Sequence, residues 1–183
     1  MLDILQTEKH FVLAHLKEGD VCADFTMGNG YDTLFLSRTV GESGRVYAFD
    51  IQLAAVESTR RRLAAENAPQ NYTLINDSHH RLAEYIKEPI KAGMFNLGWL
   101  PGGDKSRTTK RETTLAALRG AISILAPDGI ILAAVYPGHA EGESEGELIG
   151  EYLQTLDRHK YCCAKFRIIN SPASSYFYII ESK

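Results

Sequence analysis

The sequence predicts an α/β fold in which helices cover both faces of a mostly parallel, doubly wound sheet of seven strands. Short apolar runs of strand length alternate with longer helical patterns along nearly the whole chain, which is typical of a parallel sheet. The run at 130–136 is apolar throughout, as expected of a strand buried on both faces. The last two runs, 161–170 and 175–182, are separated by Ser-Pro-Ala-Ser and predict a C-terminal antiparallel hairpin.

The individual elements follow from the spacing of the apolar residues and from turn signals between them. The first helix is expected at 7–17, where Val12 and Leu16 recur at helical spacing. Glycine and proline at 41–44 and 126–129 mark turns. We therefore predict strands at 21–25, 45–50, 72–77, 93–99 and 130–136, with helices at 31–40, 53–66, 108–125 and about 146–158.

The composition predicts one soluble globular domain that spans residues 1–183. The chain carries a net charge of -3, with 44% hydrophobic and 23% charged residues, and is too apolar to be disordered. No apolar run approaches the ~18–20 residues of a membrane span, and the N-terminus does not resemble a secretory signal. We therefore expect a cytoplasmic protein. The charge excludes a strongly basic nucleic-acid binder, although not a local basic face.

The three cysteines, Cys22, Cys162 and Cys163, have neither the spacing of zinc ligands nor that of a disulfide framework. Disulfides are rare in cytosolic proteins. We therefore expect reduced thiols and no metal site.

A glycine-containing turn follows the first predicted strand and opens the next helix. In open α/β sheets, ligands bind beyond the carboxyl ends of the strands, and Gly28 and Gly30 let the backbone approach such a ligand. Asp50 ends the second strand, where a carboxylate can accept both hydroxyl hydrogens of a ribose. The pattern therefore predicts a cofactor that contains a nucleoside.

Two classes of cofactor fit a glycine turn that is followed by an acid. Dinucleotide sites normally use G-x-G-x-x-G, but Thr33 occupies the position of the third glycine. The carboxylate of Asp24, at the start of the turn, suits a cation better than a pyrophosphate. S-adenosylmethionine presents an ammonium, a sulfonium and a ribose but no phosphate, so we favour it over a dinucleotide.

The third strand is followed by Asp77, Ser78 and His79. The acid and the hydroxyl could hydrogen-bond an adenine ring, or one of them could cap the next helix, since both residue types are favoured caps. The two interpretations are compatible.

The ends of the fourth and fifth strands carry candidate acceptor residues. The Asn96 side-chain oxygen and the Leu97 carbonyl can hold the hydrogens of an amine and direct its lone pair at a methyl group. Trp99 could stack on a planar base, or it could be an aromatic of the core or rim. After the fifth strand, His139 beyond Tyr136 could act as a general base, or it could fix its loop by hydrogen bonding.

Basic residues are concentrated in two segments of the chain. The segment 105–119 lies beside the expected acceptor site and could follow a phosphate backbone. Both segments could instead be solvated helix faces. The residues are Arg60, Arg61, Arg62, Lys105, Arg107, Lys110, Arg111 and Arg119.

Three stretches of the chain resemble the motifs of one family. They are D-x-T-x-G-N-G-x-D-T-x-F-L at 24–36, N-L-G-W-L-P-G-G-D-K at 96–105 and Y-P-G-H-x-x-G at 136–142. Over nearly its whole length the chain resembles the small YtqB/MnmM-type methyltransferases, which are often labelled rRNA methylases. The resemblance implies a class I, Rossmann-like, S-adenosylmethionine-dependent enzyme and a homodimer. It also implies methylation of the aminomethyl group on wobble 5-aminomethyl-2-thiouridine, in the anticodon region of tRNA.

The resemblance also assigns residues to the site. Met27 and Ala140 depart from the small residues common in the family, and neither has an assigned role. The expected catalytic residues are Asn96, Trp99, Tyr136 and His139, and the expected substrate contacts are Trp99, Pro101, Gly102, Lys105 and Arg107. The expected cofactor contacts are Asp24, Thr26, Gly28, Asn29, Gly30, Asp32, Thr33, Asp50, Gln52, Asp77, Ser78, His79 and Asn96.

The expected chemistry is direct in-line transfer of methyl to a neutral amine. No cysteine lies in the loops after the fourth and fifth strands, so we expect no covalent enzyme intermediate. His139 or water would take the amine proton. The alternatives are an rRNA methyltransferase, a small-molecule methyltransferase, which would have no use for the basic segment 105–119, and a non-catalytic S-adenosylmethionine-binding RNA module.

Overall fold

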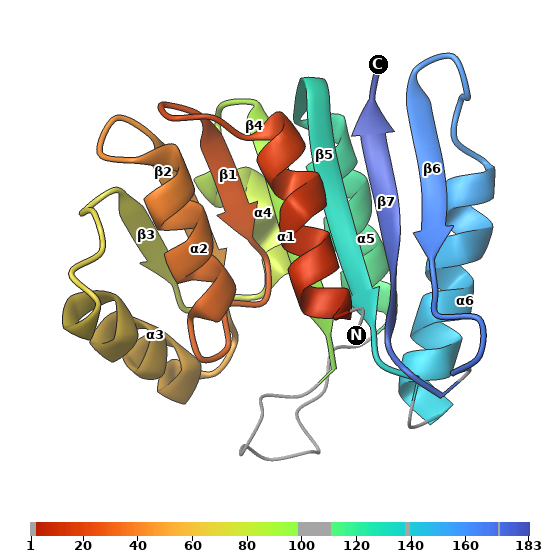
Figure 1. Cartoon of the computed structure of the whole chain (residues 1–183), viewed down its shortest axis with the longest axis horizontal. Helices are drawn as coiled ribbons and strands as arrows, with labels where there is room; N and C mark the ends of the chain where they lie inside the picture. The colour runs from red at the N-terminus through yellow and green to blue at the C-terminus, as the bar shows by residue number, and fades with distance from the viewer. Residues whose placement is uncertain (1–2, 99–110, 138–139, 172) are drawn as a thin grey trace.

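The computed structural model describes residues 3–98, 111–137, 140–171 and 173–183 (Figure 1). Its strands are β1 Val21–Asp24, β2 Arg45–Phe49, β3 Tyr72–Ile75, β4 Ile90–Leu97, β5 Leu125–Val135, β6 Tyr161–Phe166 and β7 Tyr176–Ser182. They form one sheet in the order β3-β2-β1-β4-β5-β7-β6. The pairs among β1 to β5 are parallel, whereas β7 pairs antiparallel with both β5 and β6. The predicted doubly wound sheet with a C-terminal hairpin is confirmed.

Helices cover both faces of this sheet. They are α1 Ile4–His15, α2 Tyr31–Val40, α3 Leu53–Ala65, the 3-10 turn η1 His79–Arg81, α4 Leu82–Tyr85, α5 Arg111–Ser123 and α6 Ala140–Gln154. In Figure 1, α1 and α2 lie in front of the strands and α5 lies behind them. The packing agrees, since Val12 of α1 joins Met94 of β4 in one core cluster, and Leu118 of α5 joins the next residue, Phe95, in another.

The central strands are predictable from the sequence because they are buried and therefore apolar. The six residues 130–135 of β5 are each at most 1% exposed, because helices cover the strand on both faces. Strand β4 is also buried along most of its length. Because the pairs among β1 to β5 are parallel, the carboxyl ends of these strands share one edge of the sheet.

Several element boundaries differ from those predicted, and β5 begins at Leu125 rather than at residue 130, so the expected turn at 126–129 lies within the strand. Helix α1 begins at Ile4 rather than at residue 7, because Asp3 caps it and its Oδ1 accepts hydrogen bonds from the Leu5 and Gln6 backbone N–H groups at 2.9 and 3.3 Å. Strand β4 begins at Ile90 and ends at Leu97, rather than spanning 93–99.

Helix α6 begins at Ala140, six residues before the predicted start. Gly142, expected in the loop before the helix, lies inside it, and Gly146 and Gly150 lie inside it as predicted. A Cβ atom at Gly146 or Gly150 would collide with the hydroxyl of Tyr176 or Tyr178 on β7. These glycines are therefore needed for close packing between the helix and the sheet.

Three further features of the described residues concern membrane spans, cysteines and metal sites. None of the helices among them is long and apolar enough to cross a membrane. Cys22 in β1 is buried, Cys162 and Cys163 in β6 are exposed, and all three are free thiols. Within the same ranges, no three His, Cys, Asp or Glu side chains gather in a way that could hold a metal ion.

Candidate functional site

The glycine turn after β1 is held in shape by helix α3. Gly28 and Gly30 have φ angles of 50° and 80°, in the left-handed region that favours glycine. A Cβ atom at Gly30 would lie 2.8 Å from the Thr59 Oγ1 atom of α3. Thr59 donates to the Gly28 carbonyl at 3.1 Å, and Arg62 Nε donates to the Asn29 carbonyl at 2.6 Å. The turn is thus preformed and offers backbone to a ligand.

Asp50, just past the end of β2, lies directly beside this turn. Its Oδ2 accepts a hydrogen bond from the Gly28 N–H at 3.1 Å, and its Oδ1 accepts one from the Gln52 N–H at 2.9 Å. Burial raises the pKa of Asp50, while these two backbone donors lower it. Each oxygen keeps a further lone pair for a hydroxyl. The structure therefore brings together Asp50, Gly28 and Gly30 as the sequence predicted.

Asp24 has a structural position under the turn. It is fully buried, and its oxygens accept hydrogen bonds from the Thr26 N–H at 3.1 Å and the Thr33 hydroxyl at 2.6 Å. Burial, followed by the nearby Asp32 carboxylate, raises its pKa to about 7. Asp24 therefore ties the end of β1 to the first turn of α2. Because its side chain is fully buried, it can act on a ligand in the turn only through its charge.

The residues after β3 mainly organise the next helical turn. Asp77 accepts hydrogen bonds from the Ser78 N–H at 2.8 Å and the Tyr85 hydroxyl at 2.6 Å, and pairs with Arg81 at 2.8 Å. The Tyr85 bond, together with the other donors, lowers the pKa of Asp77. Ser78 occupies the N-cap position of η1, but no side-chain hydrogen bond caps that turn or α4, so the capping interpretation is wrong. The adenine interpretation stays open, since the residues stand at the carboxyl edge of the sheet.

His79 is buried rather than open to the site. Its Nδ1 lies 3.0 Å from the Phe25 carbonyl, so Nδ1 carries the proton and donates. Burial lowers the pKa of His79 to about 4. A neutral, buried imidazole of this kind stabilises the link between η1 and the end of β1.

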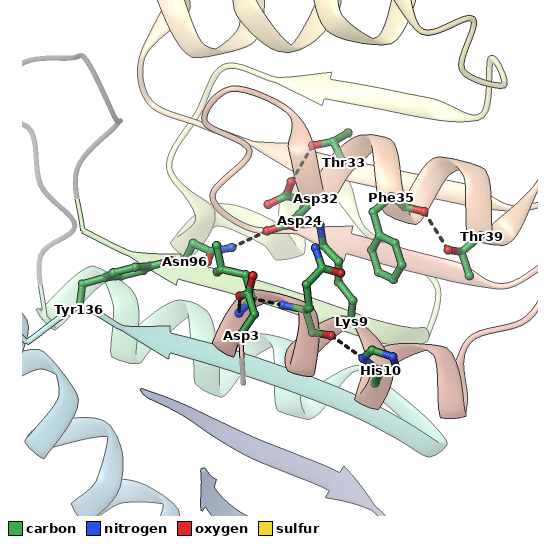
Figure 2. A network of polar contacts seen from close by, with 12 residues as sticks. Asp3, Lys9, His10, Asp24, Asp32, Thr33, Phe35, Thr39, Asn96 and Tyr136 are labelled. Carbon is green, nitrogen blue, oxygen red and sulfur yellow. Dashed lines mark hydrogen bonds and ion pairs between the residues drawn. The ribbon is translucent and has the colours of Figure 1, made fainter. Parts of the chain in front are cut away.

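Asn96 is the centre of a polar network that joins three segments (Figure 2). Its side-chain Nδ2 donates to Asp32 Oδ2 at 2.7 Å, and its Oδ1 accepts from the Tyr136 hydroxyl at 3.2 Å. Its backbone N–H donates to the Thr26 hydroxyl at 2.6 Å. Lys9 of α1 lies 3.4 Å from Asp32 Oδ1. The network places the ends of β4 and β5 against the first turn of α2.

Glu8 of α1, which is not among the residues predicted from the sequence, lies near enough to Asp32 to feel its charge. It is only 1% exposed, and its Oε1 is buried without a hydrogen-bond partner in the described part of the chain. Burial, followed by repulsion from Asp32, raises its pKa to about 8. Its signal is visible in the sequence: the buried stripe of α1 reads Ile4, Glu8, Val12, and only Glu8 in that stripe is charged.

Several predicted site residues lie outside the described residues. They belong to the loops after β4 and β5, and their placement stays a prediction. They are Trp99, Pro101, Gly102, Lys105, Arg107 and His139.

Contacts are seen for Arg62, Arg111 and Arg119 among the basic residues that are described. Arg62 stacks over the exposed Tyr31 ring at 3.5 Å from its centroid, next to the glycine turn. Arg111 lies 3.4 Å from Glu112, and Arg119 lies over the Tyr152 ring at 4.9 Å. Of these residues, Arg62 is thus the one that contacts the glycine turn.

Comparison with known proteins gives a family match and a curated relative. A family profile described as "Putative rRNA methylase" matches residues 46–181. A chloroplastic tRNA (mnm(5)s(2)U34)-methyltransferase of Arabidopsis thaliana is 39% identical over 167 residues. That alignment covers 86% of this chain but 61% of the plant protein, so the chain spans less than two thirds of this relative's length.

Solved structures match the chain over its full length. A structure from Clostridium thermocellum, described as a "putative rRNA-methylase", has a TM-score of 0.97 and 39% identity, covering 100% of this chain and 99% of that chain. A "putative methyltransferase" from Streptococcus mutans, in complex with SAH, has a TM-score of 0.91 and 31% identity, with coverage of 100% and 99%. The likeness therefore extends over both halves of the sheet.

Proposed function

The chain belongs to the family described as "Putative rRNA methylase", as its motifs predicted, and from this premise we propose that it is an S-adenosylmethionine-dependent RNA methyltransferase. The observation that carries the proposal is the contact between two groups at one edge of the sheet. The Thr26 hydroxyl of the preformed turn accepts a hydrogen bond from the backbone of Asn96, which holds Asp32 and Tyr136 with its side chain. A cofactor site and an acceptor site thereby adjoin.

The residues around the turn fit the chemistry of S-adenosylmethionine. The Asp50 carboxylate can accept the ribose hydroxyls, and the backbone at Gly28 and Gly30 leaves room for a close approach. The Asp32 carboxylate adds negative charge beside the turn, where Lys9 lies 3.4 Å from one of its oxygens. When bound, this cofactor supplies an electrophilic methyl group. The SAH complex of the Streptococcus mutans protein supports the same assignment.

The residues at the ends of β4 and β5 fit the orientation of an attacking amine. Asn96 is held on both sides, because Asp32 accepts from its Nδ2 and Tyr136 donates to its Oδ1. A side chain fixed in this way loses little freedom when a substrate binds, so most of the rate acceleration can come from orientation and proximity. The Asn96 oxygen and the Leu97 carbonyl would hold the amine hydrogens.

We propose that the substrate is the aminomethyl group of wobble 5-aminomethyl-2-thiouridine in tRNA. The name of the plant relative and the three family motifs support this choice. The family description favours rRNA as the second candidate. A cytoplasmic homodimer is part of the proposal, and light scattering of the purified protein would test the dimer.

One experiment separates these candidates. Bulk tRNA and rRNA from a strain that lacks the protein are incubated with it and labelled S-adenosylmethionine, and the nucleosides are analysed by mass spectrometry. We expect the label in tRNA, at a nucleoside whose unmethylated form is 5-aminomethyl-2-thiouridine. Label in rRNA alone would support the second candidate, and no label in either RNA would overturn the proposed activity.

A further inference from the structure

Lys9 of α1 is a cation that lies between the N-terminal helix and the candidate site. Its Nζ lies 3.4 Å from Asp32 Oδ1 and 5.3 Å from the centroid of the Phe35 ring, and both partners belong to α2. The Lys9 and Asp32 side chains are 22% and 17% exposed, so water screens this pair less than it screens a pair on the open surface. Lys9 therefore has a fixed partner at the edge of the sheet where the site lies.

The helix that carries Lys9 lies outside the stretches of sequence that resemble family motifs. Those stretches begin at residue 24, and α1 ends at His15. The helix is nevertheless fixed against the centre of the sheet, because Val12 packs in one core cluster with Met94 of β4. Helix α1 thus brings to the site a side chain that the motifs did not predict.

Asp32 connects Lys9 to Asn96 through its two carboxylate oxygens (Figure 2). Oδ1 is the oxygen near Lys9 Nζ, while Oδ2 accepts a hydrogen bond from Asn96 Nδ2 at 2.7 Å. A carboxylate accepts hydrogen bonds and donates none, so it selects the NH2 group of the amide rather than the amide oxygen. The Asn96 oxygen is thereby turned towards Tyr136, whose hydroxyl donates to it at 3.2 Å.

The orientation of the Asn96 amide depends on these side-chain contacts rather than on the backbone. The Asn96 N–H donates to the Thr26 hydroxyl at 2.6 Å, and Asn96 pairs with Ala134 of β5 in the sheet. These contacts hold the strand, but the terminal torsion of an asparagine side chain has a broad range. The bond to Asp32 is shorter than the bond to Tyr136, so Asp32 is the main restraint on that torsion.

We propose that Lys9 is a positioning residue for methyl transfer, a role that rests on the transfer to an amine proposed above. By holding Asp32, Lys9 keeps the Asn96 oxygen directed at the attacking amine. Without the ammonium group, the Asp32 carboxylate can rotate towards water, and the amide loses the partner that distinguishes its nitrogen from its oxygen. Lys9 acts through Asp32 and takes no part in making or breaking bonds.

A purely structural ion pair between α1 and α2 would have different consequences. Loss of such a pair would lower activity to the same degree whether or not the Asn96 amide is present, because independent effects add. Residues in one hydrogen-bond network are instead coupled, so that the effect of one change depends on the other. A double-mutant cycle of Lys9 with Asn96 therefore separates the two roles.

The test combines Lys9→Met with Asn96→Ala, and Lys9→Arg and Lys17→Met serve as comparisons. Lys17 is an exposed lysine just past the end of α1. For each variant, kcat and KM are measured with tRNA from the deletion strain at saturating S-adenosylmethionine, SAH affinity is measured by calorimetry, and folding is checked by circular dichroism. If Lys9→Met does not fold, Lys9→Gln, which keeps a polar end group, takes its place in the cycle.

The expected result is a loss of turnover that depends on Asn96. With Asn96 present, Lys9→Met should lower kcat about 10-fold, with KM and SAH affinity changed by less than about threefold. In the Asn96→Ala background, the same change should lower kcat by less than about twofold. Lys9→Arg should restore part of the rate because it keeps the positive charge, and Lys17→Met should match the wild type.

Four outcomes would overturn the role of Lys9. They are an unchanged kcat in Lys9→Met, an equal loss of kcat in both backgrounds, a loss confined to KM or to SAH affinity, and a Lys9→Arg variant no faster than Lys9→Met. Each of them leaves methyl transfer by the wild type intact and so spares the proposed function. Absence of methyl transfer by the wild type would instead overturn both proposals.

Discussion

The carboxyl groups in the two halves of the site differ in their hydrogen-bond partners. On the side of β2 and β3, Asp50 accepts two backbone N–H groups and Asp77 accepts one N–H and one hydroxyl. On the side of α1 and β4, Glu8 has no partner for Oε1, and its pKa is raised to about 8. Asp50 and Asp77 therefore have donors for their carboxylates before any ligand binds, whereas Glu8 Oε1 has none among the described residues. On the β3 side, the buried His79 Nε2 also lacks a partner within those residues.

The difference separates carboxylates that are oriented before a ligand binds from a carboxyl group that is costly to ionise. A cofactor binds best to groups that are already oriented, since little freedom is lost on association. A carboxyl group buried without a partner is instead harder to ionise. The second arrangement costs stability, so each half predicts a different response to mutation.

The largest expected effect is a pH-dependent gain of stability in Glu8→Gln. The pKa of Glu8 is about 8 in the folded protein and 4.5 without burial, so the folded state holds a proton that the unfolded state releases between these values. The free energy of unfolding of the wild type should therefore fall relative to the variant as pH rises from about 4.5 through 8. The difference should reach about 5 kcal/mol at high pH, as an upper figure.

Urea unfolding of both proteins between pH 5 and pH 9 checks this expectation. His79 has the opposite dependence, because its lowered pKa of about 4 removes stability as pH falls below 6.5. That contribution is present in both proteins and cancels in the difference. A difference that does not change with pH would show that Glu8 is ionised or solvated in the native state.

The second effect is a loss of turnover in Asn96→Ala. Removal of the amide frees Asp32 and Tyr136 and takes away the oxygen that orients the amine. We expect kcat to fall about 100- to 1000-fold, equivalent to roughly 3–4 kcal/mol, with SAH affinity changed by less than about threefold. Steady-state kinetics and calorimetry measure the two quantities. An equal loss of both would count against the assigned role.

The third effect is a loss of cofactor affinity in Asp50→Ala. The variant removes the ribose acceptor and leaves the Gly28 and Gln52 N–H groups without their carboxylate. The SAH dissociation constant should rise about 30-fold, or roughly 2 kcal/mol, while kcat at saturating cofactor stays within about threefold. Glu57→Ala, an exposed change on α3, serves as the control and should behave like the wild type. A fall in kcat with unchanged affinity would reverse the division between the two halves.

The smallest expected effect is that of replacing all three cysteines. Cys22 is buried in β1, and Cys162 and Cys163 lie on β6 at the sheet edge, far along the strand order from β1 and β4. The variant Cys22→Ala, Cys162→Ser, Cys163→Ser should keep its activity within a few-fold, since no covalent intermediate is expected. Loss of methyl transfer in a variant that still folds by circular dichroism would refute the non-covalent mechanism.

Local patterns were enough to predict the sheet and the glycine turn. The apolar run of β5 and the pair Gly28 and Asp50 follow directly from burial and from the backbone needs of a turn. The start of α6 is predicted six residues too late because Gly142 suggests a loop, whereas the structure buries it inside the helix. Burial of this kind depends on tertiary packing and leaves no local pattern in the sequence.

The candidate site was predicted in part. Asn96 lies in the expected place, but its link to Asp32 through the side-chain amide required the three-dimensional structure. Glu8 was missed because the predicted helix starts at residue 7, so Glu8 lies in its first turn, where an acid is usually exposed. Asp24 and His79 were assigned to the cofactor, and their burial shows that each also organises backbone around the turn.

The position of β7 has a consequence for synthesis of the chain. Residues 176–182 lie between β5 and β6 in the sheet, although they follow both in the sequence. While the ribosome is still adding the residues before position 176, β5 has an unpaired, strongly apolar edge, which is the kind of surface that invites aggregation. The sheet can close only after β7 has left the exit tunnel, so folding of the second half should be a late event, completed after translation of nearly the whole domain.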